Sequence, residues 1–228
     1  MVSNQTLLNS LLAYDYDKLK ADLEANCRED ALKSNGKPKN KLSILKRLNK
    51  DNDTASFKNI KNSAIACKYG FAFLNSYMML FSNSDFGYEN KMQGDSIEID
   101  NRFLNPYEAD KNQFVEITLT DDMVADIRVM AKEKRSKYDR KPYVIQYKGN
   151  ASDSASRDNC IGLDPKKLID VIDFTGSYTV FIAKYNAPVW LEGDTEKAML
   201  LPVNIGYGNE NIEPNAKFVT LSANYMVV

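Results

Sequence analysis

Residues 160–205 read CIGLDPKKLIDVIDFTGSYTVFIAKYNAPVWLEGDTEKAMLLPVNI and join a helix start to several strand-like segments. Asp164 and Pro165 are typical of an N-cap and of the first helical position. They predict a helix over residues 164–174. Its inward side chains are expected to be Leu168, Val171 and Ile172. The segments YTVFIAKY, APVWLEG and AMLLPVNI predict three strands after the helix.

The preceding residues predict the same kind of element order. Residues 114–119, FVEITL, alternate as a strand does. Residues 120–137 open with Thr-Asp-Asp and end in basic residues, as a helix dipole favours. Residues 141–149 predict another strand. Strand, helix, strand, helix and further strands indicate an α+β fold with helices embedded among antiparallel strands.

The N-terminal half carries weaker signals. Residues 6–26 space their apolar side chains as an amphipathic helix does, and residues 41–50 predict a short second helix. Residues 57–82 are apolar and aromatic, and Gly70 within them predicts a hairpin or a bend. A strand is expected over 95–99, and 101–113 is the best candidate for a linker. We therefore expect two domains, 1–113 and 114–228.

Composition excludes several kinds of site. The chain has 228 residues, a formal net charge of −1 and no histidine, so Ser-His-Asp catalysis and His-ligated metal sites are excluded. Three cysteines without a CxxC pair predict a reducing cytoplasm. No apolar run approaches the ~20 residues that span a bilayer. No phosphate-cradling glycine motif occurs. We expect no cofactor, no metal and no membrane.

The 160–205 stretch resembles the last half-domain of bacterial sliding clamps, the β subunit of DNA polymerase III. The matching residues are Gly162, Asp164, Pro165, Leu168, Asp170, Val171, Pro188, Val189, Leu200, Leu201, Pro202, Val203 and Ile205. Residues 114–133 look like the first strand and helix of the same domain. The resemblance implies DNA-clamp-like domains, with antiparallel sheets and paired helices, in a phage or mobile-element variant.

The resemblance also implies a function. Such a chain would be a non-enzymatic DNA replication accessory protein, a processivity factor that encircles duplex DNA without sequence preference and tethers a DNA polymerase or other replication protein. The family builds rings from six clamp domains, so two domains per chain imply a homotrimer. The family's last strand lines a pocket for partner peptides, which corresponds here to Leu200, Leu201, Pro202 and Val203.

Charges on the predicted helices identify candidate DNA contacts. Arg128, Lys132 and Arg135 lie on one flank of helix 120–137, and acidic residues lie on the other. Together with neighbouring basic residues, the predicted DNA-binding set is Arg128, Lys132, Lys134, Arg135, Lys137, Lys166 and Lys167. The alternative is that basic residues simply gather at the end of a helix, where its dipole favours them.

Two other functions stay open. Asn204 stands where the clamp family has a basic residue, and 23 residues follow Ile205. That extension could add a strand and block the ring interface or the peptide pocket. The chain would then be a monomeric clamp-fold binding or inhibitory module acting on a host replication or defence protein. A carboxylate-dependent nuclease using Asp122 is a third class, although a capped helix start explains the Asp121–Asp122 pair.

Overall fold

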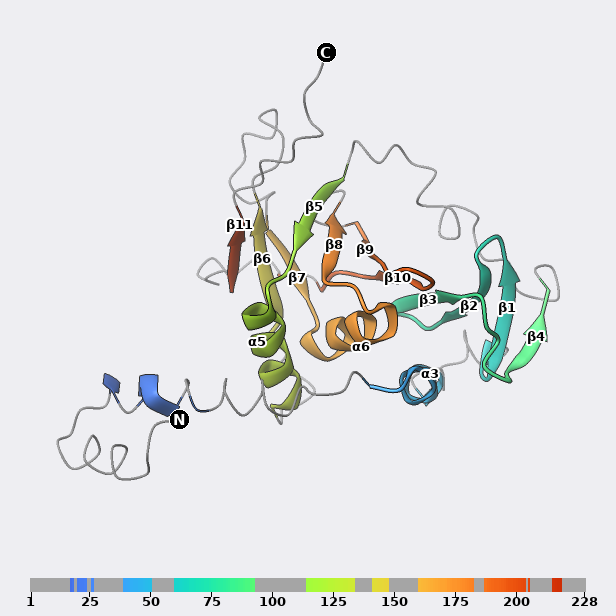
Figure 1. The fold of residues 1–228 in the computed structure, drawn as a ribbon, viewed down its shortest axis with the longest axis horizontal. Helices are drawn as coiled ribbons and strands as arrows, with labels where there is room; N and C mark the ends of the chain where they lie inside the picture. Colours follow the sequence, from blue (N-terminus) through green and yellow to red (C-terminus); the bar gives the residue numbers. More distant parts are fainter. Residues whose placement is uncertain are drawn as a thin grey trace, which may run out of the picture.

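The computed structural model describes residues 17–18, 20–23, 26, 39–50, 60–92, 114–133, 141–147, 160–182, 187–203, 205 and 215–218. These residues form an α+β fold with one large, mostly antiparallel sheet (Figure 1). Positions 17–18, 20–23 and 26 are helical, as the predicted helix 6–26 requires, and the rest of that helix lies outside the described residues. The strand predicted at 95–99 and the linker predicted at 101–113 also lie outside them.

Three longer helices follow the predicted periodicity. They are α3 (Lys41–Lys50), α5 (Asp121–Lys132) and α6 (Pro165–Thr175). α5 was predicted to continue to residue 137, which is wrong, because Glu133 already leaves the helical conformation. The inward apolar side chains of α5 end at Ala131, and the segment that follows offers no apolar residue to hold another turn against the core.

The larger sheet contains eight strands in the order β4-β1-β2-β3-β10-β9-β8-β5. Their bounds are β1 Ser63–Cys67, β2 Gly70–Leu74, β3 Met78–Ser82, β4 Glu89–Lys91, β5 Val115–Thr118, β8 Thr179–Ile182, β9 Val189–Glu192 and β10 Lys197–Leu200. All neighbours are antiparallel except β1 and β4. Pairing of β3 with β10 joins strands from both sides of the expected boundary at residue 113, and the division into two domains stays a prediction.

The hairpin predicted at Gly70 is confirmed. Gly70 opens β2 with φ +93°, a conformation that residues with a Cβ rarely adopt. A Cβ there would lie 2.6 Å from the carbonyl oxygen of Ser82 on β3. Glycine is therefore required both by the turn and by the close approach of two strands.

A smaller sheet has the order β11-β6-β7, with β6 at Tyr143–Tyr147, β7 at Cys160–Leu163 and β11 at Ala216–Phe218. β6 corresponds to the strand predicted at 141–149, and β7 was not predicted. β11 lies in the extension after Ile205, for which an added strand was considered without residue bounds. β7 and β6 are antiparallel, and β11 pairs in parallel with β6. After β10 the chain crosses to this sheet, where the Val203 N–H donates to the Gly162 carbonyl oxygen at 2.8 Å.

The C-terminal half contains a repeated unit in which a strand leads directly into a capped helix. β5 leads into α5 through Thr120, whose hydroxyl accepts the N–H of Met123 at 3.3 Å. β7 leads into α6 through Asp164, whose carboxylate accepts the N–H groups of Lys166 and Lys167. The two units interlock, because β5 pairs with β8, the strand after α6, and β7 pairs with β6, the strand after α5.

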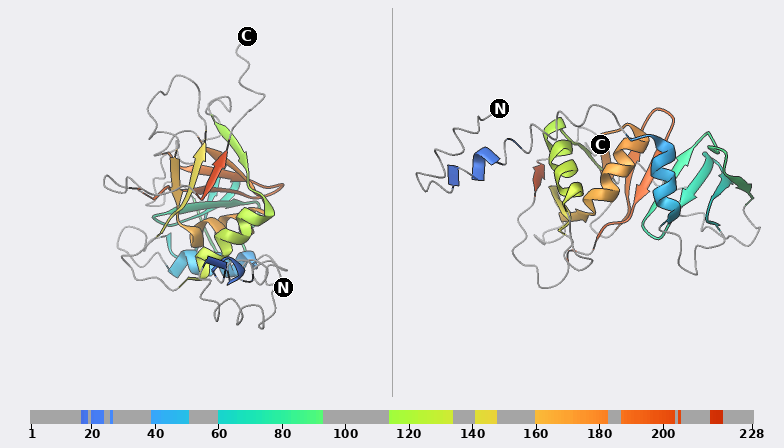
Figure 2. Two further views of the ribbon diagram at one scale, coloured as in Figure 1. Left: turned by 90° about the vertical axis from the view of Figure 1, so that its left-hand side faces the viewer. Right: turned by 90° about the horizontal axis from the view of Figure 1, so that it is seen from below.

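The helices lie side by side in one layer, in the order α5, α6, α3, which we call the helix row (Figure 2). The row lies on one side of the strands and shares the main core with them. Alternate strand residues such as Phe73, Leu80 and Val180 belong to that core. Their neighbours Met79, Trp190 and Met199 form a second apolar cluster on the opposite face of the large sheet.

Candidate nucleic-acid interface

The predicted DNA-binding residues fall on the helix row. Lys132 is exposed in the last turn of α5, and Lys166 is exposed in the first turn of α6. Lys167 is half-buried, and its ammonium lies 5.0 Å from the centre of the Tyr77 ring, within the range of a cation–π contact. Lys134, Arg135 and Lys137 lie outside the described residues.

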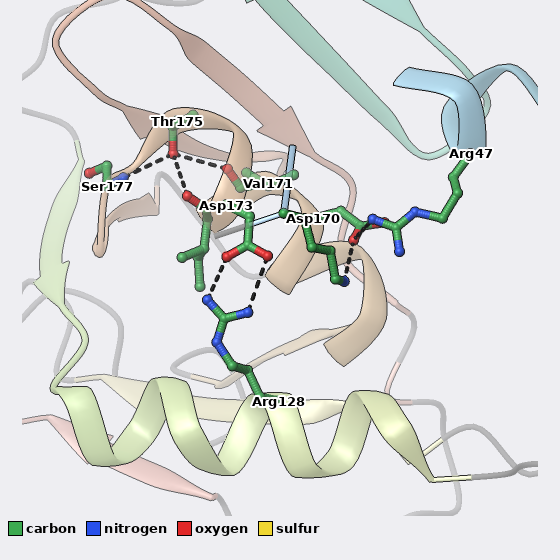
Figure 3. A network of polar contacts seen from close by, with 9 residues as sticks. Arg47, Arg128, Asp170, Val171, Asp173, Thr175 and Ser177 are labelled. Atoms are coloured by element: carbon green, nitrogen blue, oxygen red, sulfur yellow. Dashed lines mark hydrogen bonds and ion pairs between the residues drawn. The ribbon is translucent and has the colours of Figure 1, made fainter. Parts of the chain in front are cut away.

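Arg128 does not lie on an exposed flank, which corrects the expectation for that residue. Its guanidinium forms a bidentate ion pair with Asp173 of α6, with Nη2–Oδ1 at 2.5 Å and Nη1–Oδ2 at 3.1 Å (Figure 3). The side chains are 13% and 1% exposed, respectively. A carboxylate so deeply buried requires a cation with several donors, and Arg128 supplies it across the α5–α6 interface.

A second buried carboxylate ties α3 to the other side of α6. Asp170 accepts from Arg47 Nη2 at 2.6 Å and from Lys39 Nζ at 3.0 Å. Figure 3 shows Arg47 reaching toward Asp170 from the opposite side to Arg128. Burial raises the pKa of Asp170, while the charges of Lys39, Arg47 and Lys167 act to lower it. α6 thus holds two acids inside the row, one for each neighbouring helix.

A third acid pairs with the start of α3. Glu196, in the turn before β10, is buried and accepts from Lys41 Nζ at 2.6 Å and from the Thr195 hydroxyl at 2.5 Å. Lys41 and Arg47 are therefore directed toward the C-terminal half. The sequence carried a usable signal for the two acids of α6, because residues 168–174 are otherwise apolar and acids within such a run need partners.

The four residues expected to form a partner-peptide pocket differ in how exposed their side chains are. Leu200 is 1% exposed in β10 and packs in the main core, so its side chain cannot contact a partner at the surface. Leu201 is 38% exposed, and Pro202 and Val203 are half-buried. Tyr77 was not among these expected pocket residues; it is 46% exposed, and its carbonyl oxygen accepts the Leu201 N–H at 2.9 Å. Tyr77, Leu201, Pro202 and Val203 form what we call the Tyr77 patch.

In comparisons with known proteins, no protein-family model, curated protein or solved structure matches this chain. Within the described residues, no helix is long and apolar enough to cross a membrane. Among the residues that the structure describes, no group of three or more acidic or cysteine side chains could hold a metal ion. The predicted pair Asp121 and Asp122 lies exposed in the first turn of α5, after the Thr120 cap.

Proposed function

We propose that this chain is a sliding-clamp-like DNA replication accessory protein that encircles duplex DNA and tethers a polymerase. The observation that carries the proposal is the interlocked pair of strand–helix units, β5–α5 and β7–α6, with the helices in one layer and an extended sheet beside them. A layer of helices on one side and a continuous sheet on the other is suited to a curved wall. The resemblance of residues 160–205 to bacterial sliding clamps motivates the same conclusion.

In this proposal the helix row faces the duplex and acts without sequence recognition. Lys132 and Lys166 are the described members of the predicted set that are exposed on it, whereas Lys167 is half-buried and lies against the Tyr77 ring. Lysine ammonium groups contact phosphates as point charges, which positions a duplex and reads no bases. Arg128 has a different role, because its pair with Asp173 aligns α5 and α6.

The Tyr77 patch is the proposed site for the tethered polymerase. It combines exposed apolar side chains with the Lys167 ammonium beside the Tyr77 ring. An aromatic or aliphatic anchor of a partner could pack on Tyr77 and Leu201 while an acidic group pairs with Lys167. Because Asn75 accepts the N–H groups of Tyr77 and Met78, the turn that carries Tyr77 is held in place before any partner binds.

The test combines particle shape with DNA topology. A ring of three chains is expected in solution scattering and electron microscopy. On nicked circular DNA the protein is expected to stay bound at moderate salt, and linearisation should release it because a ring slides off the ends. Linear DNA with both ends blocked by bound protein is the control and should retain it. Equal retention on open linear and circular DNA, or the absence of any ring, contradicts the proposal.

One observation favours the second candidate, a monomeric clamp-fold module that binds or inhibits a host protein. The segment after Ile205 contributes β11, which pairs in parallel with β6 and so occupies one edge of the smaller sheet. The Asn215 side chain also accepts the Val144 N–H at 2.9 Å. Closing this edge removes backbone groups that another subunit could pair with. Sedimentation separates the two functions, since a monomer at all concentrations, with and without DNA, supports the module.

A further inference from the structure

α3 has an unusual charge pattern, because it contains four basic residues and no acidic one. Its buried side chains are Ile44, Leu45, Leu48 and Asn49, which define the face toward the core. Two of its cations, Lys41 and Arg47, pair with the buried acids Glu196 and Asp170. These inward pairs account for half of the basic residues on the helix.

The other two cations point away from the core. Ser43, Lys46 and Lys50 are exposed, and at 100° per residue they lie opposite the buried residues. We call them the α3 basic face. Lys46 and Lys50 are one helical turn apart, about 6 Å along the axis. Within the part of the chain that the structure describes, neither lysine has an ion-pair partner.

Charge differs between the two ends of the helix row. α5 begins with exposed Asp121 and Asp122, and its Arg128 is used internally. α3, at the opposite end of the row, exposes lysines only among its charged outward residues. Lys166 of the central helix α6 is also exposed and, within the described residues, forms no ion pair. Among the described residues of the row, exposed acids therefore lie at the start of α5, and the exposed charged residues of α3 are all positive.

We propose that the α3 basic face is a principal phosphate-contact surface for duplex DNA. Lys46 and Lys50 project from a helix whose position is fixed by a buried apolar face and by two ion pairs to the C-terminal half. Their ammonium groups are free to exchange counterions for phosphates, and such binding is strongly salt-dependent. The inference rests on the proposed function, since it names residues of the surface that faces the duplex.

The experiment measures equilibrium binding of a short fluorescent duplex by anisotropy across a salt series. The variants are K46A/K50A, the charge-preserving K46R/K50R, and K68A, which removes an exposed lysine from the β1–β2 turn. Loss of two phosphate contacts lowers the slope of log affinity against log salt by about 1.8. Over a fourfold rise in salt, the affinity of the wild type then falls about 12-fold more than that of K46A/K50A. K46R/K50R and K68A are expected to keep the wild-type slope.

The outcomes separate this inference from the ring itself. A slope unchanged in K46A/K50A, or a loss as large in K68A, overturns the assignment to α3, whatever the behaviour on circular DNA. Failure of the wild type to bind the short duplex even at low salt also overturns it. A reduced slope in K46A/K50A supports the assignment even if no ring forms, and in that case only the topological function is refuted. Thermal melts establish that each variant is folded.

Discussion

Replacing Arg128 by methionine should be among the most destabilising single changes at the helix row. Methionine keeps much of the length of the side chain but leaves the Asp173 carboxylate, which is 1% exposed, without its cation. Removing one partner of a buried pair costs about 3–5 kcal/mol. With an m value of about 2.5 kcal/mol/M in urea, the midpoint of unfolding falls by about 1.2–2 M. The sequence alone predicts a cost within about 0.5 kcal/mol, as for an exposed residue.

Three further variants make this measurement decisive. K132A, one turn later on the same helix and exposed, should cost within about 0.5 kcal/mol. D173L and the double variant R128M/D173L complete a double-mutant cycle. Because replacing both members of a buried pair by apolar residues is often neutral or stabilising, the double variant should recover most of the loss. If R128M costs no more than K132A, the ion pair is not formed and the α5–α6 packing described above is wrong.

Three other changes have defined outcomes. Burial raises the pKa of Asp170, so the native state holds the carboxyl proton more tightly than the unfolded state does. The free energy of unfolding of the wild type should therefore fall relative to that of D170N as pH rises from 3.8 toward neutrality. A difference between the two proteins that is flat with pH, or that grows in favour of the wild type, contradicts this sign. G70A should lower the free energy of unfolding by about 1–3 kcal/mol through backbone strain, and further through the clash with Ser82. G87A should cost less, because φ there is +77° but a Cβ meets nothing within 4 Å. Equal urea midpoints for G70A and G87A would refute the close approach of the two strands. D164A should cost about 1 kcal/mol by removing the cap of α6, and D164S should restore most of it; no loss in D164A would mean that the cap adds nothing.

Elements with local signals were predictable from the sequence. Each of these signals acts within a few residues of the element that it predicts. They are the helix caps at Thr120 and Asp164, the apolar periodicity of α3, and the glycine between two apolar runs that predicts a hairpin. β7 was missed because its four residues follow directly on a loop-like segment and run into a helix cap without a turn. β11 has three residues and pairs in parallel with β6, about seventy residues earlier, so nothing nearby in the sequence indicates it.

The ion pairs of the helix row could not be predicted from residue spacing. Lys39 and Arg47 reach Asp170 across separations of 131 and 123 residues, and Arg128 reaches Asp173 across 45. A helical wheel places Arg128 beside the apolar face of α5. From that position alone, an exposed cation cannot be distinguished from a partly buried one. The wheel omits the neighbouring helix α6, where the buried acids Asp170 and Asp173 lie, and Asp173 is the residue that makes Arg128 an internal cation.

The internal ion pairs also determine which surface is left to bind a polyanion. Asp170, Asp173 and Glu196 each engage a basic side chain of α3, of the segment before it or of α5, so these cations cannot leave for a phosphate without exposing a buried carboxylate. The cations that remain available therefore come from positions with no acid beside them. On α3 these are Lys46 and Lys50, in the N-terminal half of the chain. The duplex contact would then depend on the half of the protein that least resembles a sliding clamp, and on the continuous sheet that joins β3 to β10.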